Sequence, residues 1–257
     1  YWRANAQNPQ DYEGDWSDPN HWTLNANDLT GTLGGCMPTL SDTVIFDNMS
    51  FSGNSNGCNL DNIAYCKTFI CLADIRITGE ELYVGGSFFL DDNMSNYDQE
   101  GVIYFVGDGV NTINLNNTQI RNCGVVFNNP LGEWELQNDF HLHDSVTSCY
   151  TGMVLDAGVF RSNGYNITLQ SRFRSDRTTA YRVLDIRNST FDHLCNDRYN
   201  SYYGYTWDIF KIFKNEEFDT IFHFGEYSRI VNSFEDIEFV SESILNGTPK
   251  VLNYALK

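Results

Sequence analysis

The chain has 257 residues and a formal charge of −18, with 34 acidic residues against 16 basic ones. Because nucleic acids and anionic membranes are bound through Lys and Arg contacts to phosphate, this acidic composition argues against both kinds of partner. The content of aromatic residues, 15%, is far above that of a disordered coil and predicts a folded chain with a large core.

The start of the chain and its cysteines indicate an extracellular protein. No run of about 18 apolar residues occurs, so we expect no direct membrane insertion. The chain begins at Tyr1 without a basic and then apolar leader, as expected of a mature secreted product or a fragment. The seven cysteines match no zinc spacing, and we expect disulfides. The first pairs to test are Cys36 with Cys58 or Cys66, and Cys123 with Cys149.

Residues 1–43 are rich in Asn, Asp, Gly and Pro and are expected to form an N-terminal cap and the first turns. Within them, the segment GDWSDPNHW places Trp16 and Trp22 on either side of an Asp-Pro-Asn turn. We interpret the two indole rings as a cover over the open end of a stack of strands. The alternative interpretation is that Trp16 and Trp22 are ligand-binding aromatics on which sugars stack.

From residue 44 onward, short strand-like runs alternate with Asn, Asp and Gly, and no segment keeps a helical period over three turns. Apolar pairs recur about one solenoid coil apart at Val126-Phe127, Val154-Leu155 and Val183-Leu184. Asn residues that follow strands, such as Asn116 and Asn188, tolerate the left-handed backbone that a coil needs at its corners.

These features predict an all-β fold, a right-handed parallel β-helix built as a solenoid of short strands, with a Trp-containing N-terminal cap. We place the β-helix at residues 44–257 and expect loop insertions near 143–152 and 194–206. A β-sandwich is the alternative, but it would show longer, hairpin-linked strands with a cleaner alternation of apolar and polar residues.

Six motifs carry a resemblance to a known group of proteins. They are GDWSDPNHW (14–22), PTLSDTVIFD (38–47), AYCK (64–67), NTINLN (111–116), GEWELQND (132–139) and SNGYNITL (162–169). Over roughly residues 10–230, their order and spacing resemble the β-helical N-terminal portions of large Bacteroidota cell-surface adhesins, which are exported by the type IX secretion system and linked to gliding motility. The two expected insertions depart from that pattern. We therefore expect the surface that recognises a specific partner to lie in these two insertions, with Tyr202 and Tyr203 as ligand-binding aromatics.

The resemblance implies a non-catalytic extracellular module of a secreted surface adhesin, serving as a rigid stalk or ligand-presenting segment in adhesion or gliding. Its implied partners are secretion-system components and outer-membrane proteins during export, and an extracellular glycan or other surface ligand. It also implies O-glycosylation at Asp-Ser/Thr-apolar triplets, whose acceptors here are Thr43, Ser145 and Thr220.

A divalent metal site is one chemical hypothesis. Asp139, His141 and His143 would share the outward face of a strand, and two imidazoles two residues apart can chelate a metal ion. The alternative is that they are ordinary exposed polar positions on a coil. No other cofactor is expected, except that calcium would suit the oxygen-rich set Asp91, Asp92, Asn93, Asp98 and Glu100. Chance clustering in an acidic chain is the favoured explanation of that set.

The main alternative function is a polysaccharide-active β-helix enzyme, a lyase or a glycosidase, which needs carboxylates as an acid/base pair or beside a basic group. The acidic candidates are Asp91, Asp92, Asp98, Glu100, Asp185, Glu235, Asp236 and Glu238, and the basic candidates are Arg182, Arg187 and Lys211. The common hydrolase, zincin and nucleotide-binding motifs do not occur, which favours a protein that is not an enzyme. A carbohydrate-binding module is the second alternative.

Overall fold

The computed structural model describes residues 1–3, 13–27, 35–51, 57–92, 94, 97–143, 152–170, 172–175 and 180–193. The chain divides into two compact units, Tyr1–Trp207 and Asp208–Lys257, and every described residue belongs to the first. The predicted insertion at 194–206 and nearly all of the one at 143–152 lie outside the described residues.

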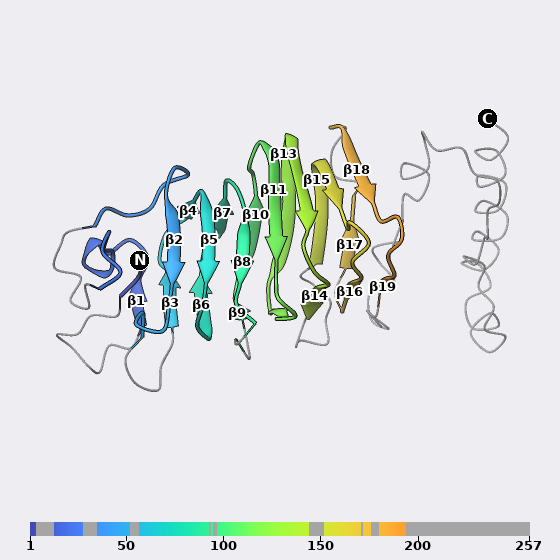
Figure 1. Cartoon of the computed structure of the whole chain (residues 1–257). Coiled ribbons are helices and arrows are strands. Elements are labelled where there is room, and N and C mark those ends of the chain that lie inside the picture. Colours follow the sequence, from blue (N-terminus) through green and yellow to red (C-terminus); the bar gives the residue numbers. More distant parts are fainter. Residues whose placement is uncertain are drawn as a thin grey trace, which may run out of the picture. The chain divides into compact units, whose positions relative to one another are not determined.

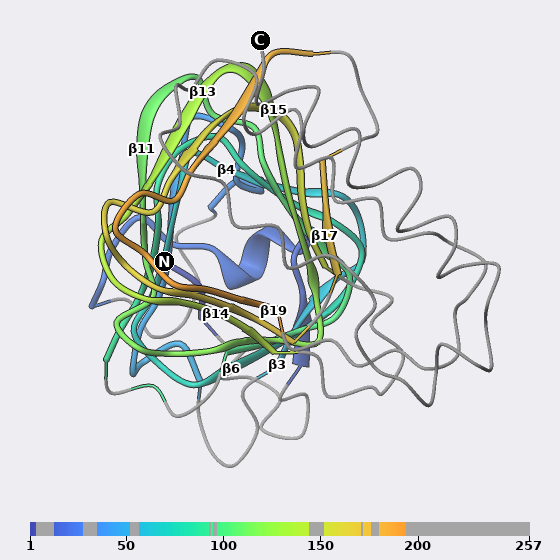
Figure 2. The same ribbon diagram turned by 90° about the vertical axis from the view of Figure 1, so that its right-hand side faces the viewer.

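Short parallel strands stack side by side as the coils of a solenoid (Figure 1). Along the stack, the coils superimpose as a three-sided ring, so that successive strands belong to three different faces (Figure 2). The only helical element in the described ranges is a single 3-10 turn, η1 (Pro19–His21). The prediction of an all-β parallel β-helix with a Trp-containing cap is confirmed.

We number the three faces by their strands. Face one contains β4 (Ala64–Cys66), β7 (Leu82–Val84), β10 (Val102–Phe105), the first parts of β13 (Gly124–Leu136) and β15 (Gly152–Arg161), and β17 (Arg172–Arg174). Face two contains β2 (Thr43–Phe46), β5 (Thr68–Cys71), β8 (Phe88–Leu90), β11 (Gly109–Asn114), the last parts of β13 and β15, and β18 (Arg182–Asp185). Face three contains β1 (Glu13–Asp15), β3 (Gly57–Leu60), β6 (Ile75–Gly79), β9 (Tyr97–Gln99), β12 (Ile120–Arg121), β14 (Phe140–His143), β16 (Ile167–Leu169) and β19 (Phe191–His193).

Side chains alternate between the interior of the solenoid and its surface, as strand geometry requires. On β8, Phe88 is fully buried inside whereas its neighbour Phe89 points outward. The interior aromatic rings stack from coil to coil, with centroids 5.0 Å apart for Phe69 and Phe88 and 5.0 Å for Phe105 and Phe127. The core is therefore a set of columns along the solenoid, each filled by residues from successive coils.

The strands β13 and β15 are longer than the others because each continues around the corner between faces one and two. The first part of β13 pairs with β10 and the last part with β11, with register shifts against β15 at the bend. Gly132 lines this corner, where an added Cβ would come within 2.6 Å of the buried Trp134 ring. Val126-Phe127 pairs with Val154-Leu155 as predicted, but Val183-Leu184 pairs with Val159 and Phe160 on face two instead.

Asparagines shape other corners. Asn116 and Asn188 have positive φ angles of 45° and 61°, which confirms the expectation that Asn supplies the left-handed turns. Asn138 links neighbouring coils, since its Oδ1 accepts the Leu115 N–H at 2.8 Å and its Nδ2 donates to Asn114.

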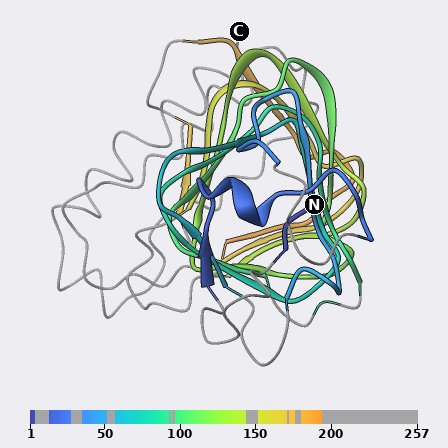
Figure 3. The ribbon, with the colours of Figure 1, turned by 90° about the vertical axis from the view of Figure 1, so that its left-hand side faces the viewer.

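The N-terminal cap closes the interior of the first coil (Figure 3). Trp2, Trp16 and Trp22 are all buried, and their rings pack edge to face, with centroids 5.1 Å apart for Trp2 and Trp22 and 4.8 Å for Trp16 and Trp22. They lie against Phe46 of β2, and the Trp2 N–H donates to the Ile45 carbonyl at 3.0 Å. The cap thus supplies the apolar cover that a preceding coil would otherwise provide.

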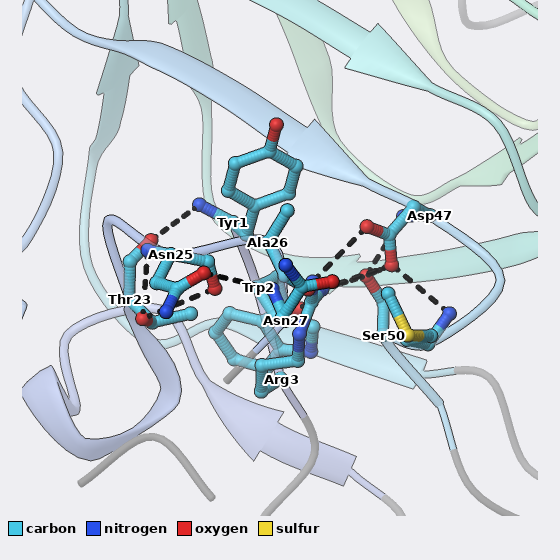
Figure 4. Close-up of polar contacts among 10 residues, drawn as sticks. Tyr1, Trp2, Arg3, Thr23, Asn25, Ala26, Asn27, Asp47 and Ser50 are labelled. Carbon is cyan, nitrogen blue, oxygen red and sulfur yellow. Dashed lines mark hydrogen bonds and ion pairs between the residues drawn. The ribbon is translucent and has the colours of Figure 1, made fainter. Parts of the chain in front are cut away.

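A buried ion pair fixes the cap to the β-helix (Figure 4). The Arg3 side chain is 1% exposed, and its two terminal nitrogens donate to the two carboxylate oxygens of Asp47 at 2.9 and 3.0 Å. The guanidinium also donates to the carbonyls of Trp2 and Ala26, each at 2.6 Å. This bidentate geometry offsets the cost of removing both charges from water.

The cysteines near the N-terminus do not pair as expected. Cys36 is exposed, Cys58 and Cys66 are buried on different faces, and none of the three forms a disulfide with another. Nearness in sequence does not bring Cys36 to either partner, because Cys36 lies at the surface whereas Cys58 and Cys66 are buried in β3 and β4. Cys149 lies outside the described residues, so its pairing with Cys123 stays a prediction.

We expect Phe88→Ala to lower the free energy of unfolding by about 3–5 kcal/mol, because it leaves a cavity in an aromatic column. The matched change Phe89→Ala removes an outward ring from the same strand and should cost about 1 kcal/mol or less. Urea unfolding followed by circular dichroism measures both. Equal losses for the two variants would contradict the inward and outward assignment.

We expect Asp47→Asn to cost about 3–5 kcal/mol, since it leaves the buried Arg3 charge without its counterion. The control is Glu100→Gln, whose partner is Arg76. Both side chains of that pair are 53% exposed, so the loss should stay below about 1 kcal/mol. Thermal unfolding of the two variants compares their losses of stability. A loss for Asp47→Asn no larger than that for Glu100→Gln would show that the ion pair does not hold the cap.

Candidate functional site

The outward side of face three carries a polar patch, which we define as Arg121, His141, His143 and Thr168. These residues lie on β12, β14 and β16, with Arg121 in register beside His143 and His141 beside Thr168. Alternation along β14 turns Phe140 and Leu142 inward, so both histidines reach the surface as predicted. The side chain of Arg121 was not anticipated as part of this group.

Only two of the three predicted metal ligands lie together. His141 and His143 share one face, but the Asp139 carboxylate accepts the Asn166 N–H at 2.8 Å on the next coil. The cationic Arg121 beside His143 disfavours a metal cation. Within the described ranges, no three His, Cys, Asp or Glu side chains are placed to hold a metal ion.

The patch contains nitrogens that have no hydrogen-bond partner. Nε of Arg121 and Nδ1 of His143 are both inaccessible to solvent and unpaired, although the two side chains as a whole are partly exposed. Buried unpaired nitrogens cost stability, about 1–3 kcal/mol each. The remaining nitrogens of these side chains can donate to oxygen-rich ligands, so the patch suits polyol or oxyanion groups better than cations.

Two of the predicted calcium ligands, Asp98 and Glu100, have other partners in the structure. Asp98 accepts a hydrogen bond from Asn122, and Glu100 pairs with Arg76 at 2.9 Å. Asn93 lies outside the described residues, and Asp91 and Asp92 precede β9 on the chain. The acids Asp98 and Glu100 are therefore engaged with donors of their own.

Asp185 lies in a charged column on face two. Its carboxylate accepts hydrogen bonds from Arg187 at 2.7 Å and from Arg161 at 3.0 Å, and Arg161 also donates to Glu133. The hydrogen bonds from Arg187, and then from Arg161, lower the pKa of Asp185 from 3.8 to about 2. Such a carboxyl stays ionised at neutral pH and cannot act as a general acid. Arg182 donates instead to the hydroxyl of Ser175 at 2.9 Å.

Trp16 and Trp22 cover the end of the stack as interpreted, and the alternative of a sugar platform is wrong, because both rings are buried in the cap and no ligand can stack on them. Thr43 is exposed at the start of β2, as a glycosylation acceptor must be, and stays a prediction. Other predicted residues lie outside the described part of the chain, namely Ser145, Tyr202, Tyr203, Lys211, Thr220, Glu235, Asp236 and Glu238.

A Tyr ladder on face one was not predicted. We use this name for Tyr65, Tyr83 and Tyr104, which point outward in register from β4, β7 and β10. The hydroxyls of Tyr83 and Tyr104 both donate to Glu81. The positions are 18 and 21 residues apart, and this uneven spacing hides the ladder in the sequence. Only the register of the coils makes it visible.

The ion pairs of Asp185 predict a pH dependence. Because its pKa is lower in the folded state, the stability it contributes is present above pH 4 and is lost as the pH falls from about 4 to about 2. We expect Asp185→Asn to cost about 2 kcal/mol near neutral pH. The difference from the wild type should shrink toward pH 2 in urea unfolding at a series of pH values. A difference that stays constant across that range would contradict the assignment.

Comparisons with protein-family models, curated proteins and solved structures found no match. Within the described ranges, no helix has the length and apolar character needed to cross a membrane. The function is therefore inferred from the residues and geometry of this chain.

Proposed function

We propose that the protein is a non-catalytic extracellular module of a large secreted surface adhesin of the Bacteroidota type. It serves as a rigid stalk or ligand-presenting segment in cell-surface adhesion or gliding, and meets secretion-system components and outer-membrane proteins during export. The observation that carries the proposal is the continuous ladder of face three, in which strands from β1 to β19 bond each to the next.

A stack of this kind suits a stalk because each coil contacts only its neighbours and the interactions repeat along one axis. The aromatic columns inside and the Asn138 contacts at a corner tie successive coils together. Outside, Arg161 bonds Glu133 on one neighbouring coil and Asp185 on the other. Bending the rod would disturb all of these contacts at once, which favours a rigid spacer.

The state of the candidate catalytic acids favours binding or support over catalysis. A general acid needs a pKa raised toward the working pH, whereas the pKa of Asp185 is lowered. Glu100 and Asp98 are held by Arg76 and Asn122. These groups act as structural ion pairs and hydrogen bonds between coils.

A second candidate function, glycan recognition, is favoured by the polar patch. Arg121 and His143 lie side by side on the outward surface of face three, and their remaining nitrogens can donate hydrogen bonds to a ligand. Hydroxyl and carboxylate groups of a glycan accept such hydrogen bonds. In this case the module presents its own binding face rather than only holding another domain away from the cell.

The two functions are tested together with the purified chain. We expect no release of reducing or unsaturated ends from neutral or acidic polysaccharides, with the wild type and Asp185→Asn giving the same background. Release that disappears in Asp185→Asn would overturn the non-catalytic proposal.

The same preparations are applied to a glycan array. Binding that falls at least tenfold in Arg121→Gln and persists in Arg76→Gln would support recognition by the patch. Arg76 is the matched control because it points outward on the same face, from β6. No binding by the wild type would leave the stalk as the proposed role and exclude the second candidate.

A further inference from the structure

The Tyr ladder places two phenol rings in direct stacking contact. Tyr83 and Tyr104 are register partners on β7 and β10, and their ring centroids are 4.6 Å apart with planes 9° from parallel. Tyr65 and Tyr83 are less closely matched, at 5.4 Å and 37°. All three rings are partly exposed, so small solutes can reach them.

Glu81 joins the two stacked phenols. The Tyr83 hydroxyl donates to one carboxylate oxygen at 2.9 Å, and the Tyr104 hydroxyl donates to the other at 3.1 Å. One carboxylate therefore aligns both hydroxyls side by side at the edge of the stack. Tyr65 makes no hydrogen bond to this carboxylate and stacks on Tyr83 at a larger angle, which makes it an internal comparison.

This arrangement favours removal of an electron and a proton together. Burial, and then the hydrogen bond to Glu81, raise the pKa of Tyr83 to about 12, so the phenol keeps its proton at neutral pH. An oxidised phenol is a strong acid and must pass its proton to an acceptor. The Glu81 carboxylate is already in hydrogen-bond contact with both hydroxyls and can accept it.

We propose that Tyr83 and Tyr104 form an oxidative cross-linking site, in which a peroxide used by a haem peroxidase joins them as dityrosine. Each phenol loses one electron and one proton to give a tyrosyl radical. The two radicals couple through a carbon ortho to each oxygen, and the hydrogens on those carbons return to the phenol oxygens as the rings become aromatic again. Hydrogen peroxide accepts the two electrons and two protons and leaves as two water molecules.

The product is a carbon–carbon bond between neighbouring coils, on the outer surface of face one. It would lock β7 to β10 without a disulfide and without disturbing the interior columns. The inference does not depend on the proposed adhesin function, since it rests only on the ring stack and its shared carboxylate.

The test treats the full chain, at low concentration, with a haem peroxidase and one equivalent of hydrogen peroxide. We expect monomeric protein that has lost two hydrogen atoms, with dityrosine fluorescence and a cross-linked peptide pair containing Tyr83 and Tyr104. Tyr83→Phe and Tyr104→Phe should each abolish this product while keeping the ring stack, and Glu81→Gln should slow its formation severalfold.

Two matched controls separate this site from general tyrosine oxidation. Tyr65→Phe changes the third ring of the ladder, and Tyr181→Phe removes the most exposed tyrosine of the described residues, at 63% exposure. Both should give the wild-type yield. Circular dichroism confirms that every variant is folded. Cross-links only between molecules, or an intramolecular product that survives in Tyr83→Phe, would overturn the proposal.

Discussion

In-register stacking of parallel coils is the constraint on which the rest of this structure depends. A single coil cannot bury its inward side chains, so each coil is stable only between two neighbours. The aromatic columns through Phe88 and Phe127, the Asn138 contacts at a corner and the charged column through Arg161 are three consequences of the same register. The Trp cap meets the same constraint at the end where no preceding coil covers Phe46.

The fold could be predicted because its signals are local. Alternation along one strand placed His141 and His143 outward, and Asn residues after strands indicated corners. The register between coils could not be predicted, that is, which residue of one coil lies beside a given residue of the next. Corresponding positions are 18 residues apart for Tyr65 and Tyr83 but 28 for Val126 and Val154, because corners differ in length.

This difference explains the errors and omissions at the candidate sites. The two histidines of β14 were found because they lie on one strand, whereas Arg121 comes from another coil and was missed. The pairing of Cys36 with Cys58 or Cys66 was wrong, because Cys36 lies at the surface whereas the other two are buried. Trp16 and Trp22 were placed in the right element, and their burial decides between the two roles considered for them.

The ends of a β-solenoid carry unpaired backbone groups that any other strand can extend, which is the route by which sheets grow into fibres. Here the Ile45 carbonyl on the first coil is already bonded to Trp2, and three indole rings cover the interior behind it. Together with a net charge of −18, this closure disfavours end-to-end joining of molecules on that side. The cap is therefore a protection against fibre growth at the first coil as well as a cover for the core.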